Sequence, residues 1–168
     1  MPYSIYDASI APMSRALANL SKILDKATDQ ATAQDIALDT LLAAQLAPDM
    51  RPFPFQIQSA SDAAKGAAAR LAGITAPSMP DTETTFPELK ARLGKTLDFL
   101  GTVTPAQLIG AEDREIVLKF PQGEMKFTGR DYVANFALPN FFFHVTTAYA
   151  LLRHKGIAIG KMDFLGGA

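Results

Sequence analysis

The chain has 168 residues, 48% of them hydrophobic, so it is long enough to bury a sizeable core in one domain without disulfides or metals. Lysine and arginine (16) nearly balance aspartate and glutamate (17), which argues against a general attraction to nucleic acid or anionic lipid. Cysteine is absent, which excludes disulfides, thiolate metal sites and a cysteine nucleophile and fits a reducing compartment.

The first residues, Met1 to Asp7, lack the basic and apolar regions of a secretory signal. No apolar run approaches the ~20 residues needed to span a bilayer. We therefore expect a cytoplasmic protein that has neither nucleic acid nor a membrane as its partner.

The first apolar pattern predicts a long helix. Apolar residues recur at alternating steps of three and four from Tyr3 to Ala27, which places one stripe on a helix of about seven turns. Ser4 and Asp7 have the spacing of a capping box at its start. Pro12 removes one amide donor and crowds the preceding turn, so we expect a kink near residues 8 to 12.

The next segment is a connection with one short helix. Residues 28 to 35 are polar, and residues 36 to 46 can hold a short helix. Three prolines within residues 48 to 54 then indicate a further connection.

Two more long helices are predicted in the middle of the chain. An alanine-rich apolar stripe runs from Phe53 to Leu71, and Gly73 is well placed to end that helix in a left-handed conformation. After a loop over residues 74 to 84, Thr85-Phe-Pro-Glu88 has the spacing of a capping box. A leucine stripe from Leu89 to Leu100 follows it and predicts the third helix.

A small hairpin is predicted before the last helix. Residues 115 to 120 and 125 to 128 alternate apolar and polar side chains, and residues 121 to 123 supply a turn. We expect this hairpin to lie against the helices, because an isolated hairpin is marginally stable in water.

The fourth long helix is predicted to open at residues 128 to 131 and to end at Gly156, with a second kink at Pro139. Together these elements predict a mainly α protein, a four-helix bundle with a small β-hairpin before the last long helix. We expect residues 1–168 to form a single helical-bundle domain.

Both histidines lie on this last helix. His144 lies beside the core stripe, where its ring can point into a bundle cavity, and this makes it the best single candidate for chemistry. The more ordinary interpretation is a half-buried histidine that is hydrogen-bonded to a neighbouring helix. His154 lies about 15 Å further along the axis, so the two cannot easily share one ion. Its place in the last turn instead favours interaction with the helix dipole.

Asp62 is the second candidate. On an alanine-rich helix, a short carboxylate that faces His144 can serve as an orienting group, a base or a ligand. The ordinary alternative is a solvated carboxylate, or one paired with Lys65 or Arg70.

Four further polar side chains are secondary candidates for contacts with a ligand: Tyr6, Gln58, Asn140 and Tyr149. Tyrosines at helical spacing are more often core residues with a satisfied hydroxyl. The Glu-x-x-His pairs of di-iron bundles are absent from the sequence. We therefore predict no metal site and no cofactor.

Distinctive motifs lie in residues 4–9, 46–50, 63–73, 138–156 and 160–166. They are similar to those of an uncharacterised bacterial family, known as domain of unknown function nineteen ninety-three. This family is similar to the DinB/YfiT-like superfamily, and the resemblance implies a DinB-like four-helix bundle, frequent dimers and, in many members, a three-histidine metal site for thiol transfer or isomerisation. With its two histidines on one helix, this chain does not supply that ligand set. The resemblance therefore carries the fold and not the activity.

Three functional hypotheses follow. We favour a non-catalytic bundle that binds a small molecule or a protein partner beside His144. The first alternative is an enzyme with an altered site, with or without a metal, that uses His144 and Asp62. The second is a structural interaction module that acts as a homodimer, in which residues 161 to 165 pack across the partner subunit.

Overall fold

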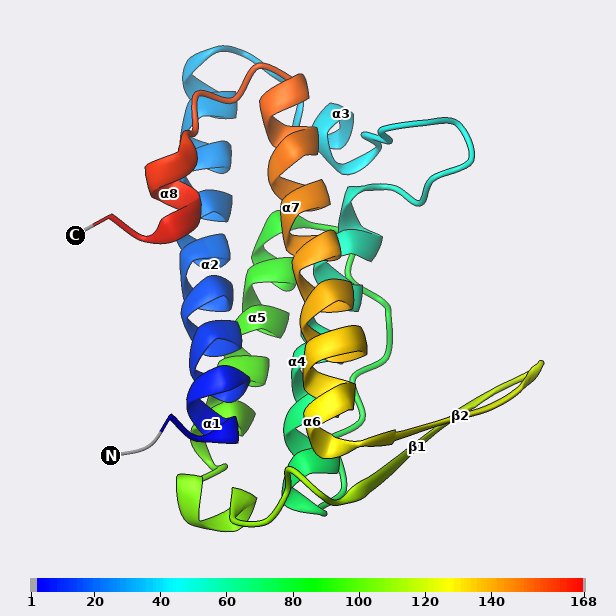
Figure 1. The fold of residues 1–168 in the computed structure, drawn as a ribbon. Coiled ribbons are helices and arrows are strands. Elements are labelled where there is room, and N and C mark those ends of the chain that lie inside the picture. Colours follow the sequence, from blue (N-terminus) through cyan, green and yellow to red (C-terminus); the bar gives the residue numbers. More distant parts are fainter. Residues whose placement is uncertain (1–2, 168) are drawn as a thin grey trace.

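Four long helices form a bundle in the computed structural model, which describes residues 3–167, and the neighbouring helices α4 and α5 run in the same direction (Figure 1). They are α2 (Ile10–Ala33), α4 (Phe53–Ala72), α5 (Phe86–Gly101) and α7 (Leu138–His154). Helix α4 packs against both α5 and α7, and α2 packs against the same two helices. Their buried apolar side chains form one cluster along the bundle axis. The predicted mainly α four-helix bundle is therefore confirmed.

The chain enters the bundle through a short helix, α1 (Ile5–Ala8), which is separated from α2 by a break at Ser9. Ser9 has φ −130° and ψ −71°, and its hydroxyl donates to the carbonyl oxygen of Ile5 at 2.5 Å. This break confirms the kink expected before Pro12. The capping box of Ser4 and Asp7 is also present.

Two details of the first prediction are wrong. Tyr3 does not belong to the buried stripe, because it precedes the helix and is 78% exposed. At the other end, α2 continues through the segment that the sequence suggested was a polar connection. Ala31 is fully buried there, and the hydroxyls of Thr28 and Thr32 donate to carbonyl oxygens one turn earlier. This buried residue, four positions after Ala27, extends the packed face by about one turn.

The boundaries in the middle of the chain follow the predicted signals closely. The short helix is α3 (Leu38–Leu42). Helix α4 begins at Phe53, so that Pro54 lies in its first turn rather than in the connection. It ends at Gly73, whose φ of 69° is the left-handed conformation. The capping box at Thr85 opens α5, and a short 3-10 helix, η1 (Pro105–Leu108), follows that helix.

The hairpin consists of β1 (Glu115–Phe120) and β2 (Gly123–Thr128), paired antiparallel. It leaves the lower end of the bundle and projects outward (Figure 1). Ile116 and Leu118 on β1 are buried, as expected, and the ring of Phe120 lies 6.3 Å from that of Phe136 on the last helix. The expectation that the whole hairpin lies against the helices is wrong, because its tip projects away from them (Figure 1) and Met125 on β2 is 45% exposed.

The last long helix is continuous but not uniform. It opens with α6 (Gly129–Tyr132), passes through a π-helical segment, η2 (Val133–Ala137), and continues as α7. Pro139 has no N–H for the carbonyl one turn earlier, and its ring crowds that turn. The helix widens into the π segment just before this proline, where the sequence predicted a kink. A final short helix, α8 (Lys161–Leu165), packs on α2 of the same chain.

Within residues 3–167, none of the helices combines the length and the apolar character required to cross a membrane.

Candidate functional site

A cleft of about 300 Å³ opens between α4 and the last helix, beside the loop that precedes α5; we refer to it as the α4–α7 cleft. Its lining combines two carboxylates, a guanidinium, an amide, an imidazole and aromatic rings. The lining residues are Phe55, Ser59, Asp62, Ala63, Arg70, Asp81, Tyr132, Phe136, Ala137, Asn140 and His144. Among these, His144, Asp62 and Asn140 are candidates from the sequence.

The π segment explains why four residues of the last helix share this cleft. Tyr132, Phe136, Asn140 and His144 follow one another at steps of four. In a regular α-helix each such step turns the side chain by about 40°, so the first and last would diverge by about 120°. The wider turns of η2 absorb part of that rotation. The local irregularity before Pro139 therefore aligns the polar face of this helix with α4.

His144 is tied to α4 by a hydrogen bond. Its Nδ1 atom lies 2.8 Å from Oε1 of Gln56, and Nε2 of Gln56 donates to the carbonyl oxygen of Arg51 at 2.9 Å. The second bond orients the amide so that its oxygen faces the imidazole, which places the ring proton on Nδ1 and the lone pair on Nε2. The rings of Phe55 and Phe143 pack edgewise on the imidazole, and burial lowers the pKa of His144. The imidazole is therefore neutral at neutral pH.

Asp62 lies in the same cleft, but its carboxylate is held by two cations. Oδ1 of Asp62 is 2.7 Å from a terminal nitrogen of Arg92 and 2.8 Å from Nζ of Lys65. Among the described residues, no hydrogen bond joins Asp62 to His144. The pairing with Lys65 is the alternative that the sequence suggested, whereas Arg70 is not a partner of this carboxylate.

Arg92 is the residue of this region that sequence reasoning missed. Its side chain is 1% exposed and forms ion pairs with Asp62 at 2.7 Å, Asp81 at 3.0 Å and Glu83 at 3.1 Å. It also donates to the carbonyl oxygen of Pro80, so it fastens the loop before α5 to the bundle. A signal was present, because an arginine directly beside a leucine stripe must find carboxylates nearby.

Glu83 is held in its charged form by this arrangement. Burial opposes ionisation, but hydrogen bonds from Gln58, its own backbone N–H and Arg92, together with the positive charge of Arg92, lower the pKa of Glu83. The loop therefore contributes a permanent negative charge next to Arg92 at neutral pH.

At the other end of the cleft, Arg70 lies over Tyr132. One terminal nitrogen of Arg70 donates to the Tyr132 hydroxyl at 3.1 Å, and the guanidinium carbon is 5.9 Å from the ring centroid. The guanidinium lies above Gly66, where an added Cβ would be 2.5 Å from it. Burial raises the pKa of the Tyr132 hydroxyl, and the nearby charge of Arg70 partly opposes this. The phenol is therefore neutral and can accept this hydrogen bond.

The remaining sequence candidates lie outside the cleft. Gln58 is buried and donates to Glu83 at 3.0 Å. The hydroxyl of Tyr149 donates to the carbonyl oxygen of Ile159 at 3.4 Å, and Tyr6 is half-buried on α1. Of the secondary candidates, only Asn140 is brought to the lining of the cleft.

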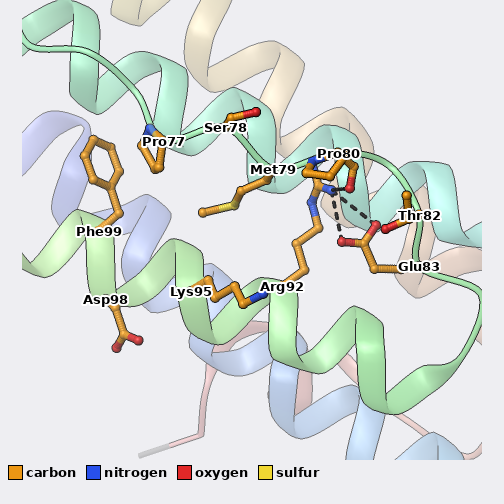
Figure 2. Close-up of a pocket in the computed structure, with 10 residues that line it drawn as sticks. All are labelled: Pro77, Ser78, Met79, Pro80, Thr82, Glu83, Arg92, Lys95, Asp98 and Phe99. Carbon is orange, nitrogen blue, oxygen red and sulfur yellow. Dashed lines mark hydrogen bonds and ion pairs between the residues drawn. The ribbon is translucent and has the colours of Figure 1, made fainter.

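A second cavity, of about 470 Å³, lies between α5 and the loop that precedes it (Figure 2). We refer to it as the loop pocket. The loop before α5 forms one wall and α5 forms the other. Its lining residues are Pro77, Ser78, Met79, Pro80, Thr82, Glu83, Arg92, Lys95, Asp98 and Phe99. Arg92 and Glu83 face this pocket, while Asp62 and Asp81 line the cleft, so Arg92 stands between the two cavities.

The three-histidine metal site that the DinB/YfiT-like resemblance implies is not supplied by these side chains. Across residues 3–167, no group of three or more His, Cys, Asp or Glu side chains is placed to hold a metal ion. Asp62, the carboxylate that the sequence suggested as a possible ligand, is already ion-paired with Arg92 and Lys65.

Comparison with known proteins supports the resemblance seen in the sequence. Residues 5–165 match the family model described as domain of unknown function (DUF1993). The crystal structure of a DinB family member protein from Shewanella denitrificans is 39% identical, with a TM-score of 0.90, over 98% of this chain and 93% of that chain. A comparison with curated proteins finds no match. Because the family model spans nearly the whole chain, the protein belongs to the DUF1993 family, and it has the fold of a DinB family member.

Proposed function

We propose that this protein is a non-catalytic binding protein whose α4–α7 cleft takes a small molecule with one anionic group. The observation that supports this is the convergence of Asp62, Arg70, Asn140 and His144 on one cleft of about 300 Å³, although they come from distant parts of the chain. Small-molecule sites in proteins combine apolar walls with a few convergent polar groups in this way.

The anionic group is assigned to Arg70. Its guanidinium makes one hydrogen bond, to Tyr132, and its other donors make none within the described residues. A guanidinium offers paired N–H groups that match a carboxylate in a bidentate geometry. The Arg70 guanidinium is held at the edge of the cleft by its hydrogen bond to Tyr132, and it lies over Gly66, where the lack of a side chain leaves room for it. Because the guanidinium is already positioned, less conformational entropy is lost when a ligand binds.

The other end of the cleft suits a hydrogen-bond donor on the ligand. Nε2 of the neutral His144 is an acceptor, and the Asn140 amide can both donate and accept. Asp81, which is 52% exposed, adds a negative charge beside them. A small carboxylic acid with a hydroxyl or amino group is therefore the ligand class that matches both ends.

The test uses protein with isotope-labelled histidine and a panel of amino acids and hydroxy acids. We expect at least one acid to shift the ring resonances of His144 saturably and to raise the unfolding temperature. Arg70→Gln should weaken this binding by tenfold or more, whereas Arg153→Gln, on the exposed end of α7, should leave it unchanged. If no acid moves the His144 signals, or both variants bind equally well, the proposed function is wrong.

A second candidate function is catalysis in the same cleft. The observation that favours it is the fixed tautomer of His144, because a neutral imidazole with a free Nε2 lone pair has the form of a general base. Asp62 would then contribute charge near the reacting group. Prolonged incubation of the protein with a hydroxy acid that binds tests this. If the cleft is catalytic, the acid is slowly converted to a product and His144→Gln abolishes the conversion. An acid that remains unchanged excludes catalysis on that compound.

We also propose that the protein is a cytoplasmic homodimer. The absence of cysteine supports the compartment. For the dimer, the support is a small hollow on the α2–α7–α8 face, lined by Pro12, Phe142 and Phe164 and bordered by Leu165, which is 43% exposed. Light scattering at micromolar concentration should give twice the chain mass, and Leu165→Glu should halve it. A monomeric wild-type protein would contradict the proposed dimer.

A further inference from the structure

One polar atom in the core of this protein lacks a partner. The Nε atom of Arg92 exposes less than 1 Å² of surface, and it makes no hydrogen bond within the described residues. Both terminal nitrogens of the same guanidinium donate to carboxylate or carbonyl oxygens. A buried donor without an acceptor costs about 1–3 kcal/mol, so this N–H requires an acceptor that the chain itself does not provide.

The orphan donor belongs to a side chain that lines the loop pocket. Figure 2 shows Arg92 entering this pocket from α5 and Met79 entering it from the loop, on facing sides. The Sδ atom of Met79 lies 3.8 Å from the hydroxyl oxygen of Thr96 and 4.0 Å from that of Ser61. These two hydroxyls are fully buried and 2.6 Å apart. The Met79 side chain therefore lies over these two buried hydroxyl groups.

Met79 is a covering group that a ligand can displace. A thioether is only a weak acceptor, and the two hydroxyls do not depend on it, because they hydrogen-bond to each other and Thr96 also donates to the carbonyl oxygen of Arg92 at 2.9 Å. Methionine is also unbranched and flexible, and it readily changes rotamer to make room. The pocket therefore combines about 470 Å³ of space with a displaceable side chain, Met79, and one lining residue, Arg92, whose Nε lacks an acceptor.

The charges around Arg92 select the kind of ligand. Three carboxylates, of Asp62, Asp81 and Glu83, surround two cations, of Arg92 and Lys65, and leave one excess negative charge. Lys95 and Asp98, which also line the pocket, add one charge of each sign and do not change this balance. A further anion is therefore disfavoured, and a cation has no acceptor to offer to an N–H donor. Pro77, Pro80 and Phe99 supply apolar walls for a compact uncharged body.

We propose that the loop pocket is a second ligand site, which binds a small neutral molecule through a carbonyl oxygen that accepts a hydrogen bond from Nε of Arg92. The ligand moves Met79 aside and packs its apolar body against the prolines of the loop and Phe99. This site is independent of the α4–α7 cleft, because it uses the opposite side of Arg92.

Methionine methyl resonances provide the direct test. Protein with 13C-methyl methionine is titrated with three five-membered-ring probes: N-methylpyrrolidone, which is a neutral amide, cyclopentanecarboxylate, and the cationic N-methylpyrrolidine. The Met79 signal, assigned with Met79→Leu, should shift saturably with the amide and at least tenfold more weakly with either charged probe. The absence of a saturable shift, or equal binding of all three probes, would overturn the proposal.

Two further measurements distinguish specific binding from nonspecific binding. Met79→Ala removes the covering side chain and should tighten N-methylpyrrolidone binding severalfold. Met162→Ala, at an exposed position on α8, should not change it. In crystals soaked with the amide, its oxygen should lie within hydrogen-bond distance of Arg92 Nε. A water molecule at that place and no probe in the pocket would refute the site.

Discussion

Nδ1 of His144 on α7 lies 2.8 Å from Oε1 of Gln56 on α4, and this contact joins the two helices that form the walls of the cleft. Because the amide of Gln56 is oriented by its own bond to Arg51, the imidazole is held in one tautomer. The contact therefore determines both the position of the ring and which nitrogen is available to a ligand.

The first prediction concerns the effect of acid on stability. Burial lowers the pKa of His144 below its ordinary value of 6.5, so between these two values the unfolded chain binds more protons than the folded one. Stability should therefore fall as the pH drops from about 6.5 through the folded pKa, with no further contribution from this group below it. Denaturant unfolding at a series of pH values measures this, and His144→Gln should flatten that part of the curve. An unaltered pH dependence in the variant would contradict the assignment.

The second prediction changes the partner of the imidazole. Gln56→Glu places a carboxylate opposite Nδ1, and an opposite charge at hydrogen-bond distance stabilises the imidazolium. We expect the pKa of His144 to rise by about one unit or more in an NMR titration. Gln45→Glu adds the same charge at an exposed position and serves as the control. Equal shifts in both variants would show that net charge, rather than this contact, is responsible.

The third prediction compares two ion-paired residues of α5. Arg92→Met removes the cation that three carboxylates share, from a side chain that is 1% exposed, and should cost about 3–5 kcal/mol of unfolding free energy. Lys90→Met breaks the pair with Asp25 at a site that is 47% exposed, and it should cost about 1 kcal/mol or less. Chemical denaturation of both variants measures the two losses of unfolding free energy. Equal losses would show that the ion pairs of Arg92 contribute no more than an exposed pair.

The fourth prediction compares two glycines. At Gly66 a Cβ meets only the flexible end of Arg70, so Gly66→Ala should raise stability by up to about 1 kcal/mol through helix propensity while displacing the guanidinium from Tyr132. At Gly129 a Cβ would lie 1.8 Å from the carbonyl oxygen of Ala111, so Gly129→Ala should be strongly destabilising. Thermal unfolding of the two variants measures the difference, and a stability loss at Gly66 would mean that its surroundings are tighter than described.

Much of the fold could be predicted because its signals are local. The capping boxes at Ser4 and Thr85 and the left-handed stop at Gly73 depend on residues within one turn of each other, and all three are present. The exceptions were decided by tertiary packing. The stripe of α2 runs on past Thr28 because Ala31 is buried, and the tip of the hairpin projects outward because nothing in its alternation specifies a neighbour.

The sequence by itself determined which segments become the long helices and most of the signals that start and stop them. Only the tertiary structure decided that Arg92 engages Asp62, that Gln56 orients His144, and that Tyr132 and Asn140 share one cleft. Helix formation follows from contacts between residues three or four apart, which a pattern of residues displays directly. The meeting of side chains from different helices depends on the rotation and axial shift of each helix, and here also on the π turns before Pro139. These are properties of the packed bundle that no single segment contains.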